Sequence, residues 1–399
     1  MKNSLIRTLV ILTLITVVSF GAILYAKGYR FSKDIDGRNV VSGTGLLVFN
    51  SVPDGARAFI NGELATATDD TINLKPGKYG VRIEKDGYFP WEKEVEITKE
   101  RVTETNALLF PKAPQLENLT SSGVNNPTVD KERKILAYTV SSASADLNGV
   151  YVASLNRGFL SLGDGHKQIA SNLIDNFSGA KLEVSPDGAE VFATIESQST
   201  GIDRVYLLKT NEFNPSPLLV TNNVERIRET WKTDEERLRN DKIRSLPKAA
   251  RAMITTYFKD PLFSPEKDKI FYIASSSAEL PLVIKPRIPS TNSTPEVRNI
   301  SEGDVYVYNI KDDRNYLVRA KSENAFPEYI WHPDSRHLFY VEGKRINTVE
   351  YDGHNITTVY AGPFLNDFVT PWLDGSGIVI LTSFNDPSIP PNLYRVVLK

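Results

Sequence analysis

The sequence has no cysteine, only four histidines and almost no net charge. The absence of cysteine excludes disulfides, thiolate metal sites and a cysteine nucleophile. A formal net charge of -2 provides no overall attraction for nucleic acid, so we predict no nucleic-acid partner. The histidines show no close or helical ligand spacing, so no metal site is predicted at His166, His332, His337 or His354.

Recognisable catalytic and cofactor motifs are also missing. No G-x-S-x-G pentapeptide exposes a serine nucleophile, and "SGTGLLVF" lacks the third glycine and the helix of a phosphate-binding loop. We therefore predict no catalytic residues and no cofactor. The chain has 24 glycines, 23 prolines and 17 tyrosines, a composition that favours short strands joined by turns.

Residues 5–26, "LIRTLVILTLITVVSFGAILYA", contain a single charge, Arg7. A helix of this length and composition can cross most of a hydrocarbon core, so we predict a transmembrane anchor in the lipid bilayer. The alternative is a cleaved signal peptide, since Lys2 and Arg7 form a basic leader, but Leu24 stands where a small residue is preferred before cleavage.

Flanking charges alone do not set the orientation of this segment, because basic residues lie on both sides of it. A long domain translocates largely regardless of flanking charge. We therefore expect a single-pass protein of the cell membrane with the bulk of the chain extracytoplasmic. The charges on the C-terminal side of the segment leave a cytoplasmic-facing sensor as another option.

A polar linker, 27–43, precedes a small all-β domain at 44–110. Short alternating strands such as "GLLVFNSV" and "YGVRIE" are separated by turn dipeptides, and Asn-Gly is the favoured dipeptide of a two-residue hairpin. The turns are expected at Pro53-Asp54-Gly55, Asn61-Gly62, Pro76-Gly77 and Asp86-Gly87.

The order of motifs in this domain, P-x-G-A, N-G, L-x-P-G-x-Y and D-G-Y, resembles the PEGA domain, whose name motif here reads Pro53-Asp54-Gly55-Ala56. The resemblance covers about 60 residues, counted over "SVPDGARAFINGE" and "LKPGKYGVRIEKDGYFPWEKEVEI" with the segment between them. It implies a surface β-sandwich that acts in binding or assembly beside other extracytoplasmic domains. It brings no catalytic residues.

The region 114–399 contains an internal repeat in which a polar turn precedes an apolar strand. The repeat is spaced like propeller blades, which bury their faces by packing around an axis. "SPDG" before an apolar strand resembles the TolB-like propeller repeat. Five blades are recognisable, and "ALLFPKAPQLENLTS" offers a sixth. The repeats are "VDKERKILAYTV", "SPDGAEVFATI", "SPEKDKIFYIA", "HPDSRHLFYVE" and "LDGSGIVILTS".

Two insertions interrupt the repeat. Residues 224–258 are charged and lack glycine, and Leu246, Ala250, Met253, Ile254 and Tyr257 share one helical face, so a two-helix arm is predicted to project from the propeller or pack on it. Residues 279–302 are too rich in proline for a central strand and predict a long loop. The arm and loop together resemble PEGA and propeller surface proteins of candidate-phylum bacteria.

The predicted fold is therefore mainly β: an N-terminal transmembrane helix, a small PEGA-type β-sandwich, and a five- or six-bladed β-propeller with a two-helix insertion. We predict a non-catalytic scaffold or binding protein that recognises a protein partner or an envelope glycan. The alternative is a propeller-type polysaccharide lyase or hydrolase, whose acids would come from different blades. The candidate partner-binding residues are Tyr88, Phe89, Trp91 and Trp231.

Overall fold

The computed structural model describes residues 2–26, 29–33, 39–141, 144–155, 165–197, 201–288, 292–323 and 326–399. The chain forms two compact units, Met1–Phe110 with Pro289–Pro295, and Pro111–Ile288 with Glu296–Lys399. Parts of the predicted linker, 27–28 and 34–38, and of the proline-rich loop, 289–291, lie outside the described residues.

The first unit begins with helix α1 (Lys2–Ala26). Residues Ile6–Ile23 of α1 are long and apolar enough to cross a membrane, and none of that stretch is buried in the protein. A helix that is apolar on all sides needs an apolar environment, which the rest of this unit does not provide. Two antiparallel strands come next, β1 (Tyr29–Lys33) and β2 (Asn39–Gly43), so the predicted linker contains a small sheet that sequence reasoning missed.

Two sheets form the sandwich of the first unit. In the three-stranded sheet, β3 pairs antiparallel with β6 and parallel with β9; the second sheet has the order β5–β4–β7–β8. The strands are β3 (Gly45–Val52), β4 (Arg57–Ile60), β5 (Glu63–Ala67), β6 (Asp70–Leu74), β7 (Gly77–Glu84), β8 (Trp91–Ile97) and β9 (Val102–Leu108).

Alternation of side chains places the core of this sandwich between its sheets. Leu47 and Phe49 of β3 meet Val81 and Ile83 of β7 in one buried cluster. At the β4–β5 hairpin, Asn61 and Gly62 have φ of 50° and 86°, the left-handed backbone that an Asn-Gly turn supplies. The predicted hairpin is therefore confirmed at this turn.

The second unit contains five four-stranded antiparallel sheets among its described residues, in the order of a propeller's blades. Sheet one consists of β11 (Asn125–Val129), β12 (Ile135–Val140), β13 (Gly149–Ser154) and β14 (His166–Ser171). Sheet two consists of β15 (Lys181–Val184), β16 (Glu190–Ile195), β17 (Arg204–Lys209) and β18 (Leu218–Leu219). Sheet three consists of β19 (Phe258–Phe263), β20 (Lys269–Ala274), β23 (Val305–Asn309) and β24 (Arg314–Arg319). Sheet four is β25 (Tyr329–Trp331), β26 (His337–Glu342), β27 (Arg345–Glu350) and β28 (Thr357–Tyr360).

The fifth sheet joins the two ends of this unit. Strands β29 (Val369–Pro371), β30 (Gly377–Thr382) and β31 (Asn392–Val397) come from the C-terminal end, and β10 (Leu116–Asn118) pairs with β31. The segment offered as a sixth blade therefore completes the fifth sheet, because its single strand finds an edge partner there. The described residues of this unit therefore form five blades.

Neighbouring sheets share buried cores. Sheets one and two are joined by a cluster that includes Val150 and Val191, and sheets five and one by a cluster that includes Leu136 and Val379. Sheets three and four share a third cluster around Val307. The turn between the first and second strands of sheet three also reaches sheet four, where the Glu266 N–H donates to Ser335 Oγ at 2.9 Å.

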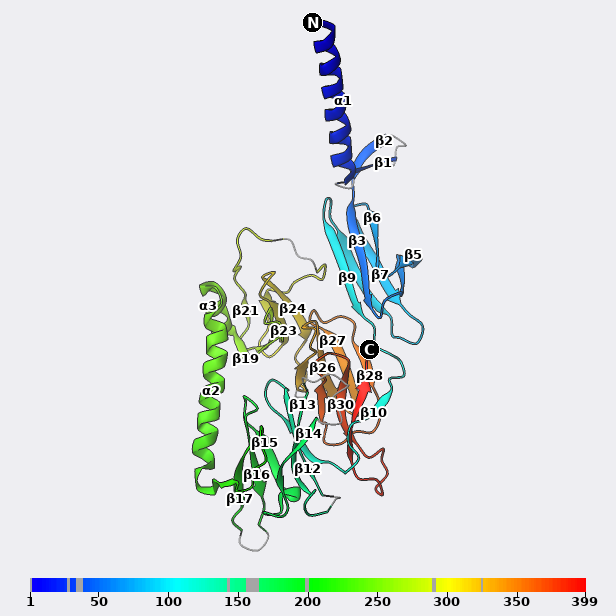
Figure 1. Ribbon diagram of the computed structural model, residues 1–399. Coiled ribbons are helices and arrows are strands. Elements are labelled where there is room, and N and C mark those ends of the chain that lie inside the picture. The colour runs from blue at the N-terminus through cyan, green and yellow to red at the C-terminus, as the bar shows by residue number, and fades with distance from the viewer. Residues whose placement is uncertain are drawn as a thin grey trace. The chain divides into compact units, whose positions relative to one another are not determined.

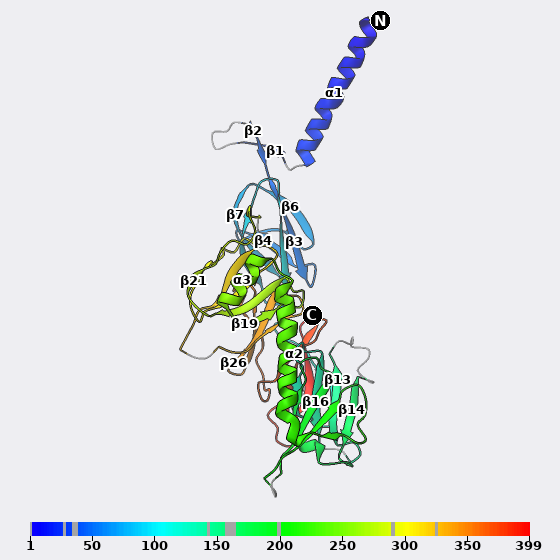
Figure 2. The same cartoon turned by 90° about the vertical axis from the view of Figure 1, so that its left-hand side faces the viewer.

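The predicted helical arm consists of α2 (Val224–Arg244) and α3 (Lys248–Tyr257), and it lies between sheets two and three. Trp231 of α2 packs on Phe192 and Val205 of sheet two. Ile243 of α2 and Met253 of α3 join the buried cluster of sheet three. Figures 1 and 2 show α2 extending from the sheet of β16 to the sheet of β19. The two helices therefore fill the place where these blades would otherwise face each other.

Short elements complete the connections. The 3-10 helices η2 (Phe177–Gly179) and η3 (Thr221–Asn223) precede β15 and α2. Strands β21 (Ala278–Glu279) and β22 (Asn299–Ile300) pair at the base of the proline-rich loop. Within the first unit, the Glu96 N–H of β8 donates to Ser293 Oγ at 2.7 Å, so part of this loop lies at the edge strand of the sandwich.

Candidate functional site

A pocket of about 730 Å³ opens at the hairpin that joins β26 to β27, within the size range of ligand sites. We call it the hairpin pocket. Its wall also includes the segment after β28 and one residue after β30. The lining residues are Tyr340, Glu342, Gly343, Lys344, Arg345, Asn347, Ile356, Ala361, Gly362, Pro363 and Asn385.

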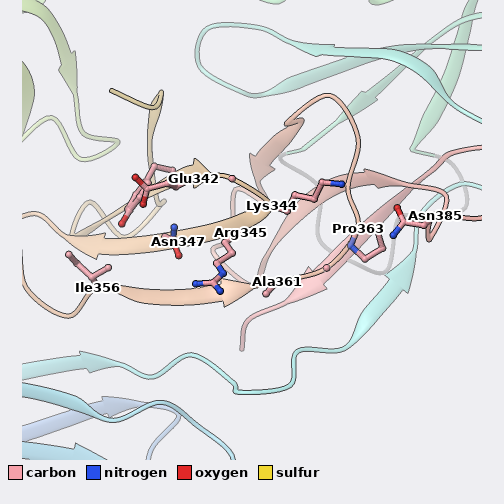
Figure 3. A pocket seen from close by; sticks show the side chains of 11 residues that line it. Glu342, Lys344, Arg345, Asn347, Ile356, Ala361, Pro363 and Asn385 are labelled. Atoms are coloured by element: carbon pink, nitrogen blue, oxygen red, sulfur yellow. The ribbon is translucent and has the colours of Figure 1, made fainter. Parts of the chain in front are cut away.

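Two cations of this pocket have no acidic partner in the part of the chain that the structure describes. Lys344 and Arg345 form no ion pair there, whereas Glu342 pairs with Arg319 of sheet three at 2.6 Å. In Figure 3, Lys344 extends toward Pro363 and Asn385. The pocket thus carries an uncompensated positive charge in a chain whose net charge is -2.

Asn347 adds a buried amide to the same pocket. Its exposed fraction is 7%, and its Oδ1 accepts a hydrogen bond from Thr358 Oγ1 at 2.7 Å. Across the described residues its Nδ2 donates to no protein acceptor. Arg345 and Asn347 lie two residues apart on β27, so their side chains share one face of the strand. The residue is buried, but its Nδ2 reaches the pocket, so a ligand in the pocket can accept a hydrogen bond from it.

The four residues predicted from sequence do not form one site. Trp91 is 5% exposed in the core of the sandwich, and Trp231 is 9% exposed against Phe192, with Nε1 donating to Glu190 Oε2 at 3.1 Å. Their rings are thus largely covered by packing within the fold. Tyr88 and Phe89 are half-buried, and a binding role for this pair stays a prediction.

A second cluster of polar side chains, which includes two of the four histidines, lies at the turn before β26. His332, Asp334 and His337 have ligand atoms within 4.8 Å of one another. The Nδ1 of His337 lies 2.7 Å from Asp334 Oδ2, and Nδ1 of His332 lies 3.2 Å from the Asp334 backbone nitrogen, which donates to it. Both Nδ1 atoms are therefore engaged within the turn.

The corresponding turn of sheet two uses its aspartate in the same way without imidazole: the Ala189 N–H donates to Asp187 as the Arg336 N–H donates to Asp334 Oδ1 at 2.8 Å. There Ser185 Oγ donates to Asp187 Oδ1 at 2.6 Å, and the same carboxylate accepts from the Ala189 N–H at 3.0 Å. The shared geometry shows that the aspartate holds the turn closed in both sheets. The residues of the histidine cluster do not fit a metal site, because the turn itself uses them.

Charge within the histidine cluster is balanced internally. Burial alone lowers the pKa of His337, but the Asp334 carboxylate outweighs burial, so the pKa of His337 lies above its ordinary value. Burial likewise raises the pKa of Asp334, and the two imidazoles reverse that effect to leave the pKa well below its usual range. The carboxylate therefore favours the protonated form of His337 inside the fold.

Sequence reasoning missed the hairpin pocket. Its residues are scattered over 340–385 and form no motif, since they meet only when β28 and the last sheet pack beside the hairpin. One signal was present: "EGKR" at 342–345 is a tight turn that carries two adjacent cations.

Comparison with known families agrees with the first of the two parts of the chain. The PEGA domain family matches residues 44–112. The chain therefore joins a PEGA domain to a five-bladed propeller. No curated protein matches it.

Solved structures similar to the chain include propellers. A putative TolB from Agrobacterium tumefaciens aligns at 14% identity with TM-score 0.21, over 69% of this chain and 73% of its own. TolB from Acinetobacter baumannii aligns at 12% identity with TM-score 0.23, over 79% and 59%. The propeller domain of the Trilobed protease from Pyrococcus furiosus aligns at 11% identity with TM-score 0.24, over 87% and 100%. The five four-stranded antiparallel sheets themselves define the propeller.

Proposed function

We propose that this chain is a non-catalytic, membrane-anchored binding or scaffold protein of the cell envelope, and that its ligand occupies the hairpin pocket. The observation that carries the proposal is a pocket that joins two unpaired cations to a buried amide with a free donor. The PEGA domain and the propeller support a role in envelope-associated binding or assembly. An envelope glycan fits this pocket better than a protein face does, because the pocket is concave and its polar groups include two cations and an amide donor without a protein acceptor among the described residues.

The pocket is poor in groups for hydrolysis or elimination. Hydrolysis of a glycoside uses two carboxyl groups, and the one carboxylate among the lining residues, Glu342, is paired with Arg319. Burial raises the pKa of Tyr340, so its phenol stays protonated and does not act as a base near neutral pH. These features favour binding over the alternative of a lyase or hydrolase.

The proposal is tested by measuring whether the chain retains a glycan and whether the retained glycan keeps its length. The full chain in detergent is incubated with purified envelope glycans and, separately, with solubilised envelope proteins. We expect a glycan to be retained at its original length. A glycan that is shortened, with new reducing or unsaturated ends, would establish the enzyme instead. Retention of a protein partner alone would move the ligand site away from the hairpin pocket.

Membrane attachment through α1 is tested by fractionation. We expect the full chain to remain with membranes after alkaline extraction, with an intact mass that includes residues 1–26, because an apolar helix of this length is stable in a bilayer. A matched chain that starts at residue 27 should be released. A mature mass that lacks 1–26 would show a cleaved signal peptide. Protection of the propeller from protease added to intact cells would contradict the extracytoplasmic assignment.

A further inference from the structure

We propose that the hairpin pocket recognises an anionic polysaccharide through its carboxylates, with Lys344 and Arg345 neutralising acid groups and Asn347 donating a hydrogen bond beside them. This inference rests on the proposed function and specifies its ligand. A guanidinium pairs with a carboxylate by two parallel hydrogen bonds, and an ammonium adds a second point of attraction.

Lys344 and Arg345 differ from the arginines of the preceding sheet in having no ion pair among the described residues. On β24 of that sheet, Arg319 is paired with Glu342 at 2.6 Å and Arg314 with Glu296 at 3.3 Å. In the described part of the chain, Lys344 and Arg345 have neither such a partner nor a hydrogen bond to protein. Free cations on an open surface are ordinary, but these two line the same pocket as a buried amide donor.

The rest of the lining suits a sugar and argues against other anions. Asn385 provides an amide for hydroxyl groups, and Ile356, which is 63% exposed, and Pro363 provide apolar surface for the ring carbons. Nucleic acid is disfavoured, because base stacking needs exposed aromatic rings and the one lining aromatic, Tyr340, is buried. For the same reason a neutral glycan lacks a stacking platform here, so the affinity must come from charge.

The direct test is a titration of the full chain in detergent with three tetramers: a tetragalacturonate, the neutral galactose tetramer of the same linkage, and a tetramer of glycerol phosphate. We expect the uronate to bind at least about tenfold more tightly than the neutral tetramer. Its affinity should fall steeply between low and high salt, because salt screens the charges. Tighter binding of the glycerol phosphate would overturn the carboxylate assignment.

Two variants identify the residues. The double substitution K344Q/R345Q should reduce uronate affinity about tenfold or more, since both neutralising charges are removed. The near-isosteric N347D keeps the acceptor for Thr358 and replaces the free donor with a negative charge, so it should reduce affinity as well. R226Q/K248Q removes the same charge from exposed positions of α2 and α3 outside the pocket and should bind as the unmodified chain does.

The outcomes separate this inference from the proposed function. Equal binding of uronate and neutral tetramers, unaffected by K344Q/R345Q, would overturn the inference and leave a glycan-binding protein. Equal losses in K344Q/R345Q and R226Q/K248Q would show a general charge effect and overturn the assigned residues. If no glycan bound at all, both this inference and the proposed function would be wrong. Matching thermal midpoints among the variants exclude a folding defect.

Discussion

Replacing Trp231 with alanine is expected to lower the free energy of unfolding of the propeller by about 3–5 kcal/mol. The indole lies 4.3 Å, between ring centroids, from Phe192 of sheet two, and its Nε1 donates to Glu190 Oε2. The substitution leaves a cavity between α2 and the sheet and an unpaired carboxylate beside it. Urea unfolding of the full chain in detergent, followed by tryptophan fluorescence and circular dichroism, measures the change.

Leu238 provides the matched control on the same helix. Its side chain is 50% exposed, so Leu238→Ala should change the free energy of unfolding by less than about 0.5 kcal/mol. Comparable losses in the two variants would show that α2 does not pack between the sheets as described. The same packing predicts that removal of 224–258 exposes Phe192 and Tyr272, so an arm deletion is not a neutral way to test partner binding.

Asp334→Asn is expected to lower the free energy of unfolding by about 3 kcal/mol at mildly acidic pH, because the buried imidazole of His337 loses its carboxylate. A group whose pKa is higher in the folded state than in the unfolded state stabilises the folded state most when the pH is below the unfolded-state pKa. This contribution is lost as the pH rises through the folded-state pKa. His337 is such a group. The difference between the unmodified chain and Asp334→Asn should therefore be larger at about pH 5.5 than at about pH 9.

Asp187→Asn is the control for this prediction, since Asp187 closes the equivalent turn with Ser185 in place of a histidine. The pKa of Asp187 is lowered, chiefly by the hydrogen bond from Ser185, so its contribution is lost only as pH falls into the acid range. We expect a loss of about 1 kcal/mol that is equal at pH 5.5 and pH 9. A loss for Asp334→Asn that is the same at both pH values would contradict a charged His337.

Much of the architecture could be predicted because its signals are local. The Asn61-Gly62 turn, the apolar run of α1 and the buried face of α3, with Ala250, Met253 and Ile254, each depend on adjacent residues. The PEGA resemblance was confirmed over 44–112. Such features depend on hydrophobic period and turn chemistry, which a single sequence displays.

The rest depends on long-range pairing. Strand β10 could be assigned to the fifth sheet only from its pairing with β31, across nearly the whole unit. Trp231 is a candidate partner-binding residue in the sequence, but which face of α2 packs on Phe192 is decided by the sheets around it. The hairpin pocket was not foreseen for the same reason: Asn347 becomes significant only once it is buried with a free amide.

The most direct test of the account is amide hydrogen exchange of the full chain in detergent, with and without tetragalacturonate. We predict that exchange slows in the hairpin 342–347 and in the segments around Pro363 and Asn385. The same segments should be unchanged in K344Q/R345Q. Slower exchange around Tyr88 and Phe89, with no change in the hairpin, would place the ligand on the PEGA domain and contradict the site proposed for the propeller.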